Sequence, residues 1–126
     1  MLTNSGKIKV MDFGIARALE DSGQTMTSTD AVVGTAQYLS PEQARGETVD
    51  TRSDLYSCGC MLFELLTGRA PFKGDSAVSV AYQHVAEMPP LPSSIAADIS
   101  PELDSMVMTS LDKRPADRYQ DAEDMR

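Results

Sequence analysis

The segment from Ser53 to Gly68 reads SDLYSCGCMLFELLTG, and its apolar residues fall on every face of the helix that it would form. A helix that is apolar all round is typical of a buried position. The segment is too short and too often interrupted by polar residues to cross a bilayer, which takes about 20 mostly apolar residues. We therefore expect it to be the central helix of a soluble domain, with the other elements packed around it.

The ends of this helix are marked by local signals. Thr51 and Asp54 occupy the two positions of a capping box, which predicts where the helix begins. Gly68, followed by Pro71, is typical of a helix end. The pattern therefore predicts one uninterrupted helix between these signals.

The two cysteines of the chain, Cys58 and Cys60, both lie in this segment. Residues two apart on a helix point roughly 200° from one another, because each turn takes about 3.6 residues. The pair therefore cannot bind one metal ion together. Two buried core thiols are the better interpretation.

Composition limits the class of protein. With 126 residues the chain is one domain at most, and it could be a piece of one. Its formal net charge of −8 argues against a nucleic-acid or anionic-membrane surface, because both need clustered Lys and Arg. No signal peptide and no membrane-spanning segment is recognisable, so we expect a cytoplasmic location.

The rest of the chain is predicted to be mainly helical. Polar and apolar residues alternate at residues 7–11, after a turn signal at residues 4–6, so residues 1–11 predict a short β-hairpin. Residues 15–31 show no sustained hydrophobic period and predict a long loop. Caps, apolar spacing and Pro or Gly stops predict four further helices, at Ser40–Gly46, at Asp75–Glu87, from Ser100 to near Arg114, and from about Gln120.

The apolar spacing also predicts which faces are buried. On the helix at Asp75–Glu87 the expected apolar face is the set Val78, Ala81, Tyr82 and Val85. On the helix from Ser100 it is the set Leu103, Met106, Val107 and Leu111.

Several separate motifs together resemble one family. Asp12-Phe13-Gly14 is followed by GTAQYLSPE at residues 34–42, then by Asp54 and Gly59 at the head of the central helix, and by Arg118 near the end. This order and spacing resemble the C-terminal lobe of a protein kinase. Ser-Pro-Glu at residues 40–42 is similar to bacterial eukaryotic-like (Hanks-type) Ser/Thr kinases, most closely the actinobacterial receptor type.

The resemblance covers essentially the whole chain and implies a partial protein kinase domain at residues 1–126. A Mg-binding loop and activation segment would occupy residues 12–42, and a helical C-lobe residues 43–126. The N-lobe would be absent. The implied fold is therefore mainly α, with helices around one buried central helix and a short N-terminal hairpin.

The resemblance assigns the nucleotide side to Asp12, Phe13 and Gly14. Asp12 is similar to the carboxylate that binds Mg²⁺ between the nucleotide phosphates, since this hard cation takes oxygen ligands. A strand-capping Asp before a turn is the alternative. Thr35 is similar to the threonine that contacts the catalytic loop and marks Ser/Thr specificity, although an ordinary turn threonine remains open.

Three further residues are implied to have structural roles. Glu42 and Arg118 resemble an internal ion pair that joins the substrate-binding loop to the last helices, with two surface charges as the alternative. Asp54 resembles the carboxylate that holds the catalytic loop, and it is also a good helix-start anion. For Glu64 and for His84, a position facing solvent is the expectation.

The loop at residues 24–30 is dense in hydroxyl groups. By position, Thr27 and Thr29 match the two loop threonines that are phosphorylated in the related bacterial kinases. A phosphate there needs a basic partner, and Arg17 matches a secondary phosphate contact. A polar loop with incidental threonines is the alternative.

A complete kinase also needs a Gly-rich loop, a paired Lys and Glu, and a catalytic loop, none of which occurs in this sequence. Two functional classes therefore stay open. The first is the substrate-side lobe of an ATP- and Mg²⁺-dependent protein Ser/Thr kinase, which would act on protein substrates together with the missing N-lobe and would be inactive alone. The second is a non-catalytic binding module that presents the helix at residues 76–87 and the loop before it as a docking surface, or else the remnant of a truncated gene. Full-length relatives are often tethered to the membrane by a segment that this chain lacks.

Overall fold

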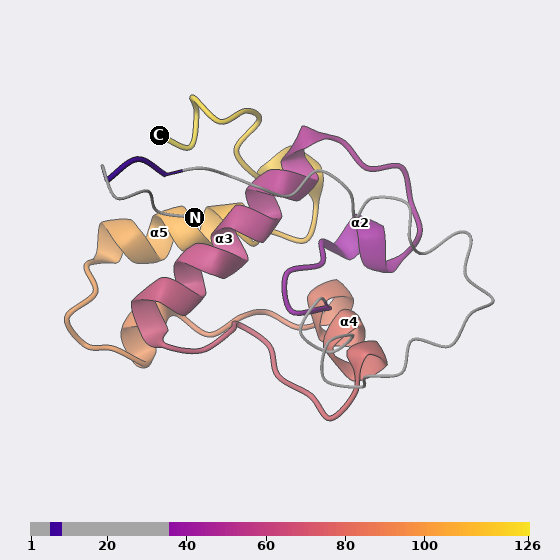
Figure 1. Ribbon diagram of the computed structural model, residues 1–126, viewed down its shortest axis with the longest axis horizontal. Coiled ribbons are helices and arrows are strands. Elements are labelled where there is room, and N and C mark those ends of the chain that lie inside the picture. The colour runs from indigo at the N-terminus through magenta and orange to yellow at the C-terminus, as the bar shows by residue number, and fades with distance from the viewer. Residues whose placement is uncertain (1–5, 9–35) are drawn as a thin grey trace.

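The computed structural model describes residues 6–8 and 36–126, and within these ranges the chain is helical (Figure 1). Ile8 takes part in an isolated β-bridge, and the rest of the predicted hairpin lies outside the described residues. The helices are α2 at Pro41–Ala44, α3 at Thr51–Thr67, α4 at Ala77–Ala86 and α5 at Pro101–Ser110, with 3-10 turns η1 at Pro92–Ser94 and η2 at Pro115–Asp117. No helix in the described part of the chain is long and apolar enough to span a membrane.

Helix α3 runs through the middle of the molecule and crosses α5 (Figure 1). It ends as predicted, at Gly68 in the left-handed conformation with φ of 74°. Its predicted start is wrong, because the N-cap is Asp50 and not a capping box at Thr51 and Asp54. Asp50 is extended and its carboxylate accepts a hydrogen bond from the backbone N–H of Arg52 at 2.9 Å, so the helix begins directly after it.

Burial of α3 is one-sided among the described residues. Tyr56, Cys60 and Phe63 are fully buried, whereas Leu65 is 77% exposed and Met61 51% exposed. Cys58 is only partly buried, so the expectation of two buried thiols is half wrong. The cause is the helix geometry itself, because residues two apart point in nearly opposite directions and only one of them can face the core.

The core lies where α3 meets α5. It comprises Tyr56, Cys60, Phe63, Val107 and Leu111. The two helices come very close at Gly59, where an added Cβ would lie 2.6 Å from the Cβ of Ser110. The glycine is therefore required by the close approach of the two helices.

The predicted helix starts at Ser40 and Ser100 are confirmed. Ser40 forms a capping box with Gln43, since the Gln43 backbone donates to the Ser40 hydroxyl and the Ser40 backbone donates to the Gln43 side chain. The hydroxyl of Ser100 accepts from the backbone N–H of Leu103. Helix α4 begins in the same way, after Ser76. These starts depend on neighbours three residues away, which is why the sequence predicts them.

The helix predicted from Gln120 is wrong, because residues 120–125 form turns. Asp124 accepts a hydrogen bond from the backbone N–H of Gln120 at 3.1 Å, and its own N–H donates to Asp121 at 2.8 Å. Aspartate side chains that bond to nearby backbone in this way compete with the helix.

The predicted apolar face of α4 is also wrong. Val80 and His84 are fully buried, whereas Val78 is 80% exposed and Tyr82 is 64% exposed. Both sets have helical spacing, so periodicity cannot choose between them. The contacts of His84 with Phe72 and with Tyr56 of α3 decide which side faces inward.

Candidate functional site

The centre of the site is an ion pair between Glu42 of α2 and Arg118 after η2. The two guanidinium Nη atoms donate to the two carboxylate oxygens, each at 2.7 Å, and both side chains are almost completely buried. The Ser53 hydroxyl also donates to Glu42 Oε1, at 2.6 Å. Burial alone would raise the pKa of Glu42, but the hydrogen bonds from Arg118 and Ser53 outweigh it and lower that pKa to about 2.

Arg118 also bonds to backbone from two other parts of the chain. Its Nε donates to the carbonyl oxygen of Asp112 at 2.7 Å, and its Nη1 to that of Arg52 at 3.1 Å. The guanidinium carbon lies 4.8 Å from the centre of the Tyr56 ring. One side chain therefore joins α2, the start of α3 and the loop after α5.

Tyr56 continues this network into α4. Its hydroxyl lies 2.8 Å from Nδ1 of His84, and the two rings meet edge to face. His84 is fully buried, so the expectation of a surface histidine is wrong. Burial and, secondarily, Lys113 lower the pKa of His84 to about 4, and burial raises the pKa of Tyr56. Both side chains are therefore neutral near pH 7.

Lys113 holds the C-terminal end of α4. Its ammonium group donates to the carbonyl oxygen of His84 at 2.8 Å and lies 4.5 Å from the centre of the Phe72 ring. Burial lowers the pKa of Lys113 to about 8. A cation at a helix C-terminus is favourable, so Lys113 anchors α4 to the loop after α5.

The segment that leads into α2 is held by α3. The Tyr38 hydroxyl donates to Glu64 Oε2 at 2.5 Å, and the Ser57 hydroxyl donates to the Tyr38 carbonyl oxygen at 2.7 Å. The hydrogen bond to Glu64 raises the pKa of Tyr38. Glu64 is partly buried and bonded, so the expectation that it faces solvent is wrong.

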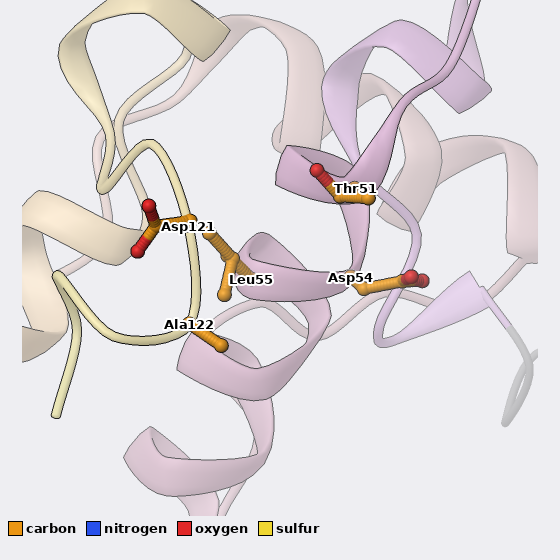
Figure 2. A pocket seen from close by; sticks show the side chains of 5 residues that line it. All are labelled: Thr51, Asp54, Leu55, Asp121 and Ala122. Atoms are coloured by element: carbon orange, nitrogen blue, oxygen red, sulfur yellow. The ribbon is translucent and has the colours of Figure 1, made fainter.

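Asp54 is exposed at the start of α3 and lines a mostly apolar pocket of about 280 Å³. The other lining residues are Thr51, Leu55, Asp121 and Ala122 (Figure 2). Figure 2 shows the carboxylates of Asp54 and Asp121 pointing away from one another, with Leu55 and Ala122 between them. Within residues 6–8 and 36–126, no group of three or more His, Cys, Asp or Glu could hold a metal ion.

The structure thus brings Glu42 and Arg118 together, whereas Asp54 forms no hydrogen bond or ion pair with either of them. The remaining predicted site residues lie outside the described residues; they are Asp12, Phe13, Gly14, Arg17, Thr27, Thr29 and Thr35.

Sequence reasoning missed Ser53, Tyr56, His84 and Lys113 as members of the network. Ser53 and Tyr56 are three apart on α3, which places them on one face and was a usable signal. His84 shares its helix face with Val80, four residues earlier, and that signal was masked by the stronger apolar stripe through Val78 and Tyr82. For Lys113 no sequence signal exists.

Comparison with known proteins gives consistent matches. The family model described as protein kinase domain matches residues 1–125. The whole chain is 65% identical to part of a probable serine/threonine-protein kinase of Streptomyces coelicolor, and 63% identical to part of the serine/threonine-protein kinase PknB of Mycolicibacterium smegmatis. It is 60% identical to part of PknB of Mycobacterium tuberculosis. The chain spans 19–20% of the length of these relatives.

Proposed function

Because this chain belongs to the protein kinase domain family, we propose that it forms the substrate-side lobe of an ATP-dependent serine/threonine protein kinase. The observation that carries the proposal is the buried Glu42–Arg118 pair, which fixes α2, directly after the segment at residues 36–40, to the start of α3 and to the loop after α5. A rigidly held segment suits the positioning of an acceptor protein, since phosphoryl transfer depends mostly on positioning and electrostatics. The substrates would be proteins with exposed Ser or Thr.

We assign ATP and Mg²⁺ to the complete kinase. Asp12 would offer a hard carboxylate oxygen to Mg²⁺, next to Phe13 and Gly14, and Thr35 would contact the catalytic loop. Asp54, at the exposed start of α3, would hold the backbone of that loop. The metal would neutralise phosphate charge, whereas the described residues would hold the acceptor side.

Regulation by phosphorylation is part of the proposal. Thr27 and Thr29 would be modified in the complete kinase, with Arg17 as one basic contact to the phosphate. A phosphate adds about −1.5 to −2 charges and orders a segment only where a cation can reach it. Mass spectrometry of an active complete kinase should find both threonines phosphorylated, and finding both unmodified would contradict this part.

A second candidate function is a non-catalytic binding module. Its support is the apolar surface on α4 and just after it, where Val78, Tyr82, Met88 and Leu91 are exposed. A partner protein would dock on this surface without any phosphoryl transfer. A cytoplasmic location suits either candidate.

A chimeric kinase distinguishes the kinase-lobe function from the binding-module function. Residues 1–126 replace the matching segment of the Mycolicibacterium smegmatis relative, and incorporation of labelled γ-phosphate into a Ser/Thr protein substrate is measured. We expect activity from the chimera, loss of activity with Asp12→Ala, and no activity from the 126-residue chain alone. A folded but inactive chimera would favour the binding module, and transfer by the chain alone that Asp12→Ala abolishes would contradict the expected inactivity.

A further inference from the structure

Tyr56 lies between the two ends of the buried network. Its side chain is fully buried, and the guanidinium carbon of Arg118 lies over its ring, 4.8 Å from the ring centre. On the α4 side, its hydroxyl lies 2.8 Å from Nδ1 of His84. One side chain of α3 therefore contacts both the cation of the Glu42–Arg118 pair and a buried residue of α4.

The ring of Tyr56 contacts Arg118 from a direction that the hydrogen bonds do not use. The N–H groups of Arg118 donate to the Glu42 carboxylate and to the carbonyl oxygens of Asp112 and Arg52. These N–H groups all lie in the plane of the guanidinium group. An aromatic ring over its face attracts the cation, and the attraction is stronger where water is excluded. The ring therefore holds the guanidinium group in the plane from which it bonds to Glu42.

The hydroxyl of Tyr56 fixes where the ring lies. Burial raises the pKa of Tyr56 and lowers that of His84 to about 4, so a neutral phenol faces a neutral imidazole near pH 7. Both side chains are fully buried. A buried polar group that loses its partner is costly, so the two side chains hold one another in place. The position of the ring over Arg118 therefore depends on α4.

A second buried ring, that of Phe72, contacts the same neighbours except Arg118. It meets the His84 ring edge to face at 4.9 Å between centres, and the ammonium group of Lys113 lies 4.5 Å from its centre. The cation over the Phe72 ring is thus Lys113, whereas Arg118 lies over Tyr56. Phe72→Leu therefore removes a core ring next to His84 without removing the contact with Arg118, and it serves as the matched control.

We propose that Tyr56 is a positioning residue, whose ring sets the Arg118 guanidinium for its paired bonds to Glu42 and whose hydroxyl makes this setting depend on His84. Through Glu42 the arrangement reaches α2, which directly follows the segment assigned to the acceptor side. The consequence for catalysis rests on the proposed kinase function, and the proposal goes further by naming the residue that links α4 to that segment. Tyr56 touches neither the nucleotide nor the reacting atoms in this scheme.

The first test observes Arg118 directly and is independent of kinase activity. Its Nε–H donates to the Asp112 carbonyl oxygen, and NMR of the ¹⁵N-labelled 126-residue chain measures how fast this proton exchanges with solvent. We expect Tyr56→Leu to accelerate the exchange about 10- to 30-fold, because the ring over the cation is lost. Phe72→Leu should change it by less than about twofold. Equal acceleration in the two variants would show that the Tyr56 ring only fills the core, and it would overturn the proposal.

The second test concerns the link from Tyr56 to α4. His84→Leu should accelerate exchange of the Arg118 proton about 3- to 10-fold, the value of roughly one hydrogen bond. In a Tyr56→Phe background the same substitution should change the exchange by less than about twofold, because the hydroxyl that transmits the effect is already absent. An equal effect of His84→Leu in both backgrounds would overturn the link. Because Tyr56→Phe keeps the ring, this pair of variants also decides the proposal if Tyr56→Leu does not fold.

The third test separates binding of the acceptor from chemistry. In the active chimera, we expect Tyr56→Leu to raise KM for the acceptor peptide about 3- to 10-fold, while KM for ATP stays within about twofold of the parent. Phe72→Leu should leave both KM values within about twofold. A fall in kcat with peptide KM unchanged in Tyr56→Leu would contradict the positioning role. If the parent chimera is inactive, the proposed function fails by itself, and the exchange measurements still decide whether Tyr56 positions Arg118.

Discussion

Glu42 and Arg118 lie 76 positions apart in the sequence and form two parallel hydrogen bonds of 2.7 Å in the interior of the protein. Removing two charges from water is costly, and only close geometry with additional hydrogen bonds offsets the cost. Here Ser53 and the carbonyls of Asp112 and Arg52 provide those bonds. The pair therefore makes α2 depend on the end of the chain.

Glu42→Gln should destabilise the fold strongly, because it leaves the Arg118 charge buried without a countercharge. We expect the free energy of unfolding to fall by about 3–5 kcal/mol. Urea denaturation followed by circular dichroism measures it. The control is Arg45→Gln, which breaks the exposed pair with Glu47 and should cost at most about 1 kcal/mol. Equal losses of unfolding free energy in Glu42→Gln and Arg45→Gln would contradict a special role for the buried pair.

Gly59→Ala should overpack the contact between α3 and α5, since the new Cβ would lie 2.6 Å from the Cβ of Ser110. We expect a loss of about 1–3 kcal/mol in thermal or chemical unfolding, although Ala is the better helix former. Ser110→Gly removes the opposing Cβ, so Gly59→Ala should cost less in that background. An additive double variant would show that the clash is not the cause.

Stability should fall as the pH drops from 6.5 toward 4, because burial lowers the pKa of His84 from 6.5 to about 4. Between these values the unfolded chain binds a proton at His84 that the folded chain does not. The contribution of neutral His84 to stability is therefore complete above pH 6.5 and is lost progressively as the pH falls toward 4. The slope should approach about 1.4 kcal/mol per pH unit.

His84→Gln is the control for this pH dependence. Between pH 4.5 and 6.5, the slope of the unfolding free energy against pH should be shallower in the variant by up to about 1.4 kcal/mol per pH unit, the effect of one proton. Glu42 also titrates in the unfolded chain around its ordinary pKa of 4.5 and adds to the slope at the lower end of this window, but it does so equally in parent and variant, so the difference between the two slopes reports His84. Equal slopes in parent and variant would contradict the assignment to His84.

The two cysteines should react at very different rates. Cys60 is fully buried, and burial raises the pKa of its thiol to about 12, so little thiolate forms. Cys58 is partly exposed. We expect iodoacetamide at pH 8 to modify Cys58 first in the folded chain and both cysteines in urea. Peptide mass spectrometry distinguishes them, and prior labelling of Cys60 would contradict the burial pattern.

Local signals predicted much of the fold correctly. The helix starts after Ser40 and Ser100 and the stop at Gly68 are short-range features, since each is made by neighbours a few residues away. The order of motifs from residue 12 to Arg118 likewise identified the family, because that order depends on sequence alone. Prediction failed at Gln120, where side-chain bonds of Asp121 and Asp124 replaced the helix.

Sequence by itself therefore determined most of the helices, most of their boundaries and the family. Tertiary structure alone decided which side of α3 and α4 is buried, and so that His84 lies in the core while Tyr82 and Leu65 lie outside. The physical reason is that a helix forms through bonds within the segment, whereas its orientation depends on the shape of distant partners. Gly59 lets Ser110 approach, and Tyr56 offers a hydroxyl to an imidazole 28 positions away.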